Sequence, residues 1–200
     1  MYKRQQFNGW YERVVEIDGN DKLVFGIASE VIPLFDQLVP AAVRDAPVGA
    51  IYEWRTDNLA LGIGQRVTRE RGAALIIDYG HTKSSTGETL QAVGGHAFVD
   101  PLTSPGEVDL TAHVDFEAIS LAAESMGARI HGPVDQVRLL RNLGIDKRAA
   151  ALKAYASPEK ASEIDEACKR LLGETRTGMG KLFKAIAISH PDLNSMPGFE

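Results

Sequence analysis

The stretch AALIIDYGH, residues 73–81, is a continuous run of apolar residues with polar residues at its far end. Such a run, with a glycine before it and another near its end, is typical of a strand buried on both faces. It predicts an α/β fold in which helices cover both sides of a parallel sheet. Ligands of open α/β sheets lie beyond the carboxyl ends of the strands, which points to Asp78, Tyr79 and His81. The alternative is a core strand that stops at a turn, where Asp78 satisfies loop amides.

The composition is that of an ordinary globular protein. A length of 200 residues suits one domain, with or without an appendage. The formal net charge of -5 gives no reason to expect nucleic acid or an anionic membrane as a partner. A single cysteine, Cys168, cannot form an internal disulfide and fits a reducing compartment, so we expect a cytoplasmic protein. No apolar run is long enough to span a bilayer, and the basic start lacks the apolar stretch of a secretory signal.

The rest of the chain alternates between strand and helix patterns, which is the α/β signature. Residues 10–17 and 23–27 flank an Asp-Gly-Asn cluster and are expected to form a hairpin. We therefore expect a hairpin insertion over residues 1–54 and a helix–strand core with inserted helices over residues 55–200. The further elements that we expect are a strand at 50–54, a helix at 57–71, loops at 82–105, a helix at 116–126, a strand at 128–130, helices at 136–143, 146–156 and 158–172, and a strand at 182–188.

The tripeptide Gly62-Ile63-Gly64 has the spacing of a dinucleotide-binding fingerprint. That fingerprint must follow a strand, open a helix and continue to a third glycine. Here the two glycines fall inside an expected helix and precede the strand. We therefore predict no dinucleotide site at this position.

Three histidines follow the strand at residues 74–79: His81, His96 and His113. Aspartates lie among them, and Asp115 is a good N-cap for the helix expected from residue 116. One interpretation is a metal site, but no histidine pair has the helical spacing of a zinc enzyme and no cysteine is nearby. A second is general acid–base catalysis. A third is structural, with the polar groups bracing a long loop by hydrogen bonds.

Several motifs, in this order and spacing, resemble the MidA-type family of class I S-adenosylmethionine-dependent methyltransferases. The family includes the mitochondrial protein arginine methyltransferase needed for complex I assembly. The matching motifs are LIIDYGH (75–81), TLQA (89–92), His96 with FVDPL (98–102), PGE (105–107), DLTAHVDF (109–116), and MG (179–180) with LFK (182–184).

The resemblance implies the C-terminal half of a Rossmann-like methyltransferase sheet with helical and hairpin insertions. In class I methyltransferases the last strand is antiparallel to the others, so we expect residues 182–188 to be antiparallel. It also implies S-adenosyl-L-methionine as cofactor and a protein substrate, with an arginine of a respiratory complex I subunit as the acceptor. The arginine acceptor rests on family resemblance alone, which is a weak basis for a substrate.

The sequence departs from the family in its first half. Family members are longer, and their first half carries a glycine-rich cofactor loop, an acidic residue for the ribose and an Asn-Glu-Phe-Phe-Asp-Ala-Leu-Pro-like segment. None of these occurs here, so we expect no cofactor-binding residues in this chain and treat Met1 as an internal or misassigned start. The missing half, or a second copy of the chain, is then the expected partner.

For the site we predict two catalytic residues, Asp78 and His113. Four others are expected to bind the substrate, namely Tyr79, His81, His96 and Asp115. No metal ligands are expected. The alternative function is a truncated, non-catalytic remnant or a protein-binding module, in which His113 and Asp115 only brace a loop and cap a helix.

Overall fold

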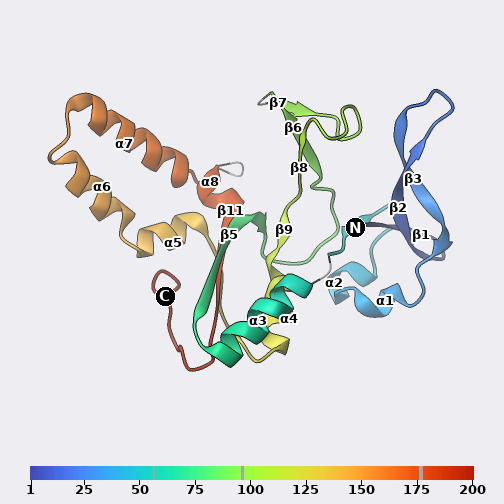
Figure 1. Cartoon of the computed structure of the whole chain (residues 1–200), viewed down its shortest axis with the longest axis horizontal. Helices are drawn as coiled ribbons and strands as arrows, with labels where there is room; N and C mark the ends of the chain where they lie inside the picture. The colour runs from blue at the N-terminus through green and yellow to red at the C-terminus, as the bar shows by residue number, and fades with distance from the viewer. Residues whose placement is uncertain (56, 96, 176–177) are drawn as a thin grey trace. The chain divides into compact units, whose positions relative to one another are not determined.

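The computed structural model describes residues 1–55, 57–95, 97–175 and 178–200 (Figure 1). The chain forms two compact units, each made of two segments. Unit 1 comprises Met1–Thr56 and Ser84–His113, and unit 2 comprises Asp57–Lys83 and Val114–Glu200. The elements in chain order are β1 (Tyr2–Gln6), β2 (Gly9–Ile17), β3 (Leu23–Val31), α1 (Phe35–Leu38), α2 (Ala41–Arg44), β4 (Ile51–Glu53), α3 (Asn58–Glu70), β5 (Ala73–His81), β6 (Gln91–Gly94), β7 (Ala97–Val99), β8 (Asp109–Thr111), β9 (Val114–Asp115), α4 (Phe116–Ser125), β10 (Arg129–Asp135), α5 (Gln136–Asn142), α6 (Ile145–Lys153), α7 (Pro158–Leu171), α8 (Met179–Leu182) and β11 (Phe183–Ser189).

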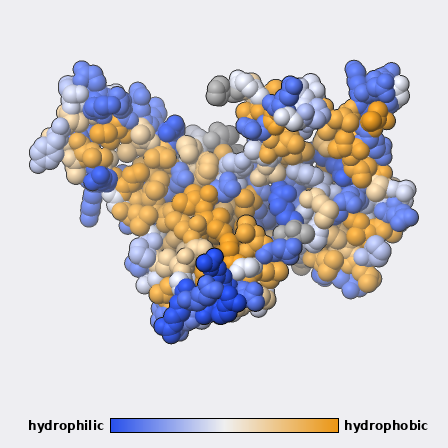
Figure 2. Space-filling view, in the orientation of Figure 1, coloured by the Kyte–Doolittle hydropathy of each residue, from blue (hydrophilic) through white to orange (hydrophobic). Residues whose placement is uncertain are grey.

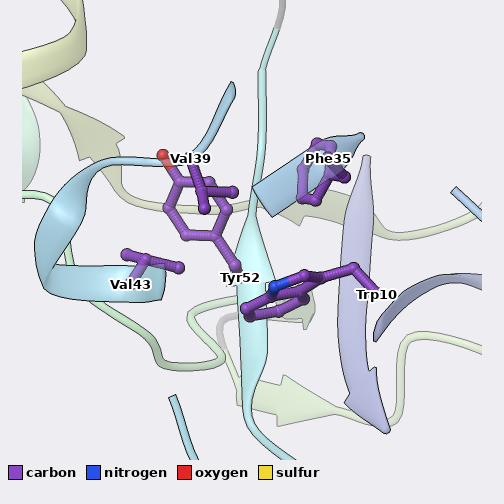
Figure 3. Close-up of a cluster of buried hydrophobic side chains, with 5 residues drawn as sticks. All are labelled: Trp10, Phe35, Val39, Val43 and Tyr52. Atoms are coloured by element: carbon purple, nitrogen blue, oxygen red, sulfur yellow. The ribbon is translucent and has the colours of Figure 1, made fainter. Parts of the chain in front are cut away.

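Unit 1 is built on an antiparallel sheet in the order β3-β2-β1-β4. The expected hairpin is therefore confirmed as β2 and β3, and it gains a third strand from β1. Buried aromatic and aliphatic side chains hold the sheet to the short helices α1 and α2 (Figure 3). Trp10 lies at the centre, with its ring 6.0 Å from that of Phe35 and 6.4 Å from that of Tyr52, both edge-on. Such contacts supply the packing that an isolated hairpin lacks.

The prediction that residues 89–105 form a loop is partly wrong. This stretch contains β6 and β7, which pair with β8 in a small antiparallel sheet of order β7-β6-β8. Each strand is only three or four residues long, and Gly95 turns the chain with a left-handed φ of 57°. Gly94 ends β6 and Gly95 follows it, and glycine is the usual residue of a tight hairpin.

Unit 2 contains the sheet that the stretch at residues 73–81 predicted, with its strands in the order β10-β11-β5-β9. β11 is antiparallel to both β10 and β5, and β5 is parallel to β9. The prediction that the last strand runs against the others is therefore confirmed. Ile76 pairs with Ile186, and Ile130 pairs with Ile188, which places β5 and β10 on either side of β11.

Helices cover both faces of this sheet at β11, which confirms the α/β class. On one face α3 and α4 pack against the sheet through Val67, Ala123 and Ile188. On the other face Leu139 of α5 packs against Ala185, together with Phe199 near the end of the chain. In the part of the chain that the structure describes, we find no helix long and apolar enough to cross a membrane.

The expectation that β5 is buried on both faces is wrong. Ile76 packs in the core beneath α3 and α4, but Leu75 is 55% exposed and Ile77 is 43% exposed. Successive side chains of a strand point to opposite faces, so one face of β5 is covered and the other is open to solvent. β9 pairs with β5 only at Gly80 and His81, which leaves most of one edge of β5 without a described partner strand. Figure 2 shows hydrophobic residues at the surface in the region where β5 lies in Figure 1.

The two glycines of the Gly62-Ile63-Gly64 tripeptide lie inside α3 and before β5, so the dinucleotide fingerprint is excluded by its context. Gly64 has a packing role instead. A Cβ at this position would lie 2.9 Å from the Cα and carbonyl oxygen of Ala123, because α3 and α4 cross closely there. Gly62 has open space around it.

Candidate functional site

Asp78 lies near the carboxyl end of β5, where sheets of this class bind ligands. The side chain is half-buried, and its Oδ1 accepts a hydrogen bond from the amide of Tyr79 at 2.8 Å. No other hydrogen bond or ion pair involves this carboxylate within the described residues. A half-buried carboxylate with a single backbone partner retains the capacity to accept further hydrogen bonds.

A row of charges crosses the sheet at this level. Lys184 of β11 pairs in register with Asp78 on one side and with Asp135 of β10 on the other. Its ammonium group bonds to Asp135 at 2.8 Å, and Lys181 bonds to the other oxygen of Asp135 at 2.6 Å. Partial burial opposes ionisation of Asp135, but the hydrogen bonds from Lys181 and Lys184 outweigh it and lower the pKa of Asp135. The ammonium group of Lys184 therefore bonds to Asp135 and not to Asp78, so the Asp78 carboxylate can bind another partner.

Tyr79 packs edge-on against Phe183 of β11, with ring centroids 5.5 Å apart. This contact matches the registered pairing of the two residues across β5 and β11. The packing anchors the Tyr79 ring at the carboxyl end of the sheet.

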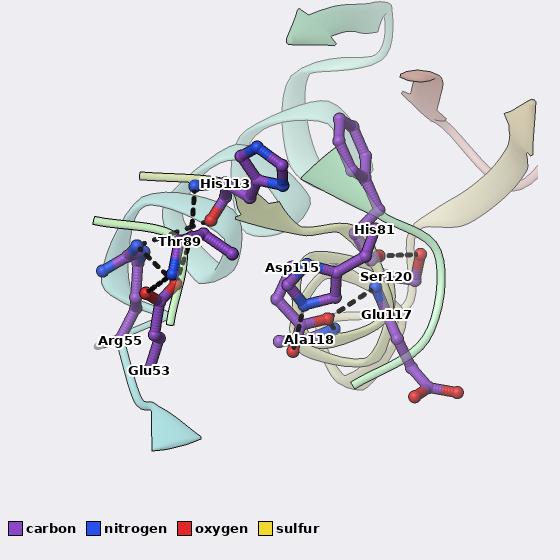
Figure 4. A network of polar contacts seen from close by, with 10 residues as sticks. Glu53, Arg55, His81, Thr89, His113, Asp115, Glu117, Ala118 and Ser120 are labelled. Atoms are coloured by element: carbon purple, nitrogen blue, oxygen red, sulfur yellow. Dashed lines mark hydrogen bonds and ion pairs between the residues drawn. The ribbon is translucent and has the colours of Figure 1, made fainter. Parts of the chain in front are cut away.

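His81 and Asp115 lie side by side where β5 pairs with β9. The distance from His81 Nε2 to Asp115 Oδ2 is 3.6 Å. Asp115 Oδ1 accepts hydrogen bonds from the amides of Glu117 and Ala118, so the predicted N-cap of α4 is confirmed (Figure 4). One carboxylate therefore both caps a helix and faces an imidazole.

Gly80 makes this close pairing possible. A Cβ on Gly80 would lie 2.2 Å from the carbonyl oxygen of Val114 and 2.9 Å from the ring of Phe116. Any larger residue would push β9 away from β5 and separate His81 from Asp115. Gly80 therefore allows the neighbouring strand β9 to lie close to β5.

Asp57 is a residue that the sequence analysis did not single out for the site. It precedes α3, but its side chain makes no capping hydrogen bond. Burial raises the pKa of Asp57, and the negative charge of Asp115 raises it further. Two carboxylates that interact in a partly desolvated place are typical of functional sites.

His113 belongs to unit 1 and is held there by its backbone. Its amide donates to the hydroxyl of Thr89 at 2.9 Å, and its carbonyl accepts from Arg55 at 3.4 Å. Glu53 ties Thr89 and Arg55 together. These three partners lie 24 to 60 positions from His113 in sequence, and although Thr89 belongs to the TLQA motif, nothing in that motif indicates its contacts with Glu53 and His113, so sequence reasoning missed them.

The structure thus pairs His81 with Asp115 and places Asp78 and Tyr79 on the same strand. His96 lies outside the described residues. Among the residues that the structure does describe, no group of three or more histidine, cysteine, aspartate or glutamate side chains could hold a metal ion.

Comparison with known proteins gives a family for this chain. Residues 2–134 match the family described as "Putative S-adenosyl-L-methionine-dependent methyltransferase". The chain is 36% identical to the protein arginine methyltransferase NDUFAF7 homolog of Drosophila melanogaster, with 100% of this chain and 48% of that protein covered. It is 36% identical to the mitochondrial protein arginine methyltransferase NDUFAF7 of Bos taurus, with 90% and 40% covered. For the human NDUFAF7 protein the identity is 35%, with 72% and 32% covered.

Two crystal structures from Burkholderia thailandensis have the same fold. One is a native structure that is 31% identical with a TM-score of 0.74, and the alignment covers 100% of this chain and 52% of that one. The other is bound to S-adenosyl-homocysteine and is 30% identical with a TM-score of 0.74, covering 100% and 50%. The chain therefore spans about half the length, or less, of the relatives it matches. It belongs to the S-adenosyl-L-methionine-dependent methyltransferase family of these proteins, the MidA-type family.

Proposed function

We propose that this chain carries the acceptor side of an S-adenosyl-L-methionine-dependent protein arginine methyltransferase. The observation that supports this most directly is the Asp78 carboxylate, which has one backbone partner at the carboxyl end of β5 in a chain of this family. Guanidinium groups bind carboxylates through charge-assisted, often bidentate hydrogen bonds. His81, Asp115 and Asp57 add an imidazole and two further carboxylates within unit 2.

Methylation of a guanidinium nitrogen requires the nitrogen to be aligned with the methyl group and to lose a proton, with S-adenosyl-L-homocysteine as the other product. In this proposal Asp78 orients the guanidinium by accepting its N–H hydrogen bonds. The proton passes to Asp78, or to His113 acting as a general base. Tyr79, His81, His96 and Asp115 contribute to acceptor binding.

The cofactor is S-adenosyl-L-methionine in this proposal, but the residues that hold it do not come from this chain. At the end of β5 the space beside Gly80 is filled by Val114 and Phe116, so this glycine forms no cradle for a ligand. The glycine-rich loop that family members carry in their first half does not occur in the sequence. We therefore assign cofactor binding to a polypeptide segment outside residues 1–200.

The acceptor is proposed to be an arginine of a respiratory complex I subunit, as the resemblance implies. The named animal relatives are mitochondrial proteins, while the single cysteine fits any reducing compartment, and we propose the cytoplasm for this chain. Peptides from complex I subunits and unrelated arginine peptides of equal charge would distinguish a specific acceptor from general affinity for arginine.

A second candidate function is a protein-binding module without catalysis, which the exposed Leu75 and Ile77 favour. The two functions are separated by assaying methyl transfer to arginine peptides after mixing this chain with the separately produced first half of a full-length relative. We expect transfer by the mixture and a loss of about 100-fold or more with Asp78→Asn, since positioned acid–base groups contribute on that order. A stable complex of the two halves that transfers no methyl group would support the binding module instead.

A further inference from the structure

Glu53, the last residue of β4, has a buried side chain that is only 7% exposed. Both of its carboxylate oxygens are bound by one residue, Thr89. The amide of Thr89 donates to Oε1 at 2.6 Å, and its hydroxyl donates to Oε2 at 2.5 Å. A buried carboxylate must be compensated by such donors, so Glu53 and Thr89 hold each other in a fixed geometry.

The backbone amide of His113 bonds to this pair directly, and its carbonyl is linked to the pair through Arg55 (Figure 4). The hydroxyl of Thr89 donates to Glu53 and at the same time accepts the amide hydrogen of His113. Arg55 pairs with Glu53 at 3.6 Å and donates to the carbonyl oxygen of His113 at 3.4 Å. The peptide groups on both sides of the His113 Cα are therefore oriented by residues that Glu53 itself holds.

The order of these residues in the chain explains why hydrogen bonds to His113 are needed to fix its position. Unit 1 is made of two segments, and Glu53 and Arg55 lie at the end of the first. Thr89 lies near the start of the second segment and His113 is its last residue. Between Thr89 and His113 the chain passes through the short strands of the β7-β6-β8 sheet. Without the hydrogen bond from His113 to Thr89, the position of His113 would depend on the conformation of all the residues between them.

From this geometry we infer that Glu53 is a positioning residue for His113, acting through Thr89 and Arg55. The inference rests on the proposed function for the role of His113 in methyl transfer. Glu53 touches no reacting atom in this account. It fixes the backbone from which the His113 side chain projects, and a misplaced catalytic group loses rate even when it is chemically intact.

The test uses a matched pair at Thr89, because Thr89→Val removes the hydroxyl with little change in shape and Thr89→Ser keeps it. The first measurement is hydrogen–deuterium exchange of the His113 amide in the whole chain. We expect exchange about tenfold faster or more in Thr89→Val, since a lost hydrogen bond of this kind is worth about a factor of ten. Thr89→Ser should exchange as the wild type does. Equal exchange in wild type and Thr89→Val would overturn the inference.

The second measurement is methyl transfer by the same variants, mixed with the first half of a relative. We expect kcat to fall about tenfold in Thr89→Val with KM for the peptide unchanged, and Thr89→Ser to restore it. If Thr89→Val does not fold, Glu53→Gln replaces it, because the amide keeps the size of the side chain but can accept at only one atom. The inference would also be overturned if Thr89→Ser restored neither the amide exchange rate of His113 nor kcat to the wild-type value. Transfer by His113→Ala at the wild-type rate would overturn the role of His113 in the proposed function, whereas amide exchange decides the positioning by itself.

Discussion

Asp115 faces His81 across the two-residue parallel pairing of β9 with β5, with 3.6 Å between Oδ2 and Nε2, while its Oδ1 caps α4. The two uses fall on different oxygens of one carboxylate. Helix capping needs an oxygen acceptor, and serine supplies one as well as aspartate does. Pairing with an imidazole and binding a guanidinium both need the negative charge. The two roles can therefore be separated by substitution.

We expect Asp115→Ala to lower the free energy of unfolding by about 1 kcal/mol, because the cap of α4 is lost. Asp115→Ser should remain close to the wild type in stability, and both variants should lose methyl transfer in the presence of a cofactor-binding half. Urea denaturation and a transfer assay on the same samples give the two quantities. Wild-type transfer by Asp115→Ser would show that the carboxylate serves only as a cap.

Asp57 gives a stability change with a defined pH dependence. Burial, and then the charge of Asp115, raise the pKa of Asp57 above its ordinary value of 3.8, so the folded state holds the proton more tightly than the unfolded state does. The stability that Asp57 contributes is present below pH 3.8 and is lost as the pH rises through the folded pKa. Asp57→Asn should therefore be more stable than the wild type at neutral pH, and this difference should vanish in acid.

Asp135→Asn is the control of opposite sign. The pKa of Asp135 is lowered by Lys181 and Lys184 against the effect of burial, so its stabilisation is present above pH 3.8 and is lost as the pH falls through the folded pKa. This variant should be less stable than the wild type at neutral pH and equal to it in acid. Urea unfolding of both variants from acidic to neutral pH checks the two signs, and a pH-independent effect of Asp57→Asn would contradict the raised pKa of Asp57.

Two glycines of α3 form a matched pair for the packing of α3 on α4. Gly64→Ala should destabilise the protein by about 1–3 kcal/mol, because the new Cβ would lie 2.9 Å from the backbone of Ala123. Gly62→Ala, in open space, should stabilise it by up to about 1 kcal/mol through helix propensity. Midpoints of urea unfolding at constant m-value give both numbers. The same sign for both variants would mean that the helices are not in close contact at Gly64.

The exposed face of β5 should make this chain associate with itself. Leu75 and Ile77 are 55% and 43% exposed beside an edge that lacks a described partner along most of its length. Apolar edges of that kind pair with other chains. We expect a dimer or larger species in sedimentation velocity, and a shift to monomer in the double variant Leu75→Thr/Ile77→Thr. Leu110→Thr, at a leucine that is 59% exposed in β8, is the control and should leave the association unchanged.

The sequence predicted the features that depend on local signals. The apolar run before Asp78 predicted β5, and the polar residue before an amphipathic stretch predicted the cap at Asp115. It did not predict which face of β5 is open, because a continuous apolar run looks the same whether one face or both are covered. It also missed the contact of Glu53 with Thr89, since the two residues are 36 positions apart and nothing in their neighbourhoods signals the pairing.

The small β7-β6-β8 sheet was missed for a different reason. Its strands are three or four residues long and fall below the length at which alternation can be distinguished from irregular chain. The antiparallel direction of β11 was predicted from the family resemblance and not from its residues. Composition and periodicity specify that Phe183–Ser189 is a strand, but its direction depends on how the chain returns to the sheet.

In our proposal this chain supplies the acceptor side and needs a cofactor-binding half from outside residues 1–200. Calorimetric titration of the chain with S-adenosyl-L-methionine tests it most directly, first alone and then after addition of the first half of a relative. We expect no binding heat for the chain alone and a measurable affinity for the mixture, and Asp78→Asn should leave this affinity unchanged while it lowers methyl transfer by about 100-fold or more. Micromolar binding by the chain alone, on the order of -8 kcal/mol, would contradict it and would place the cofactor site within this chain.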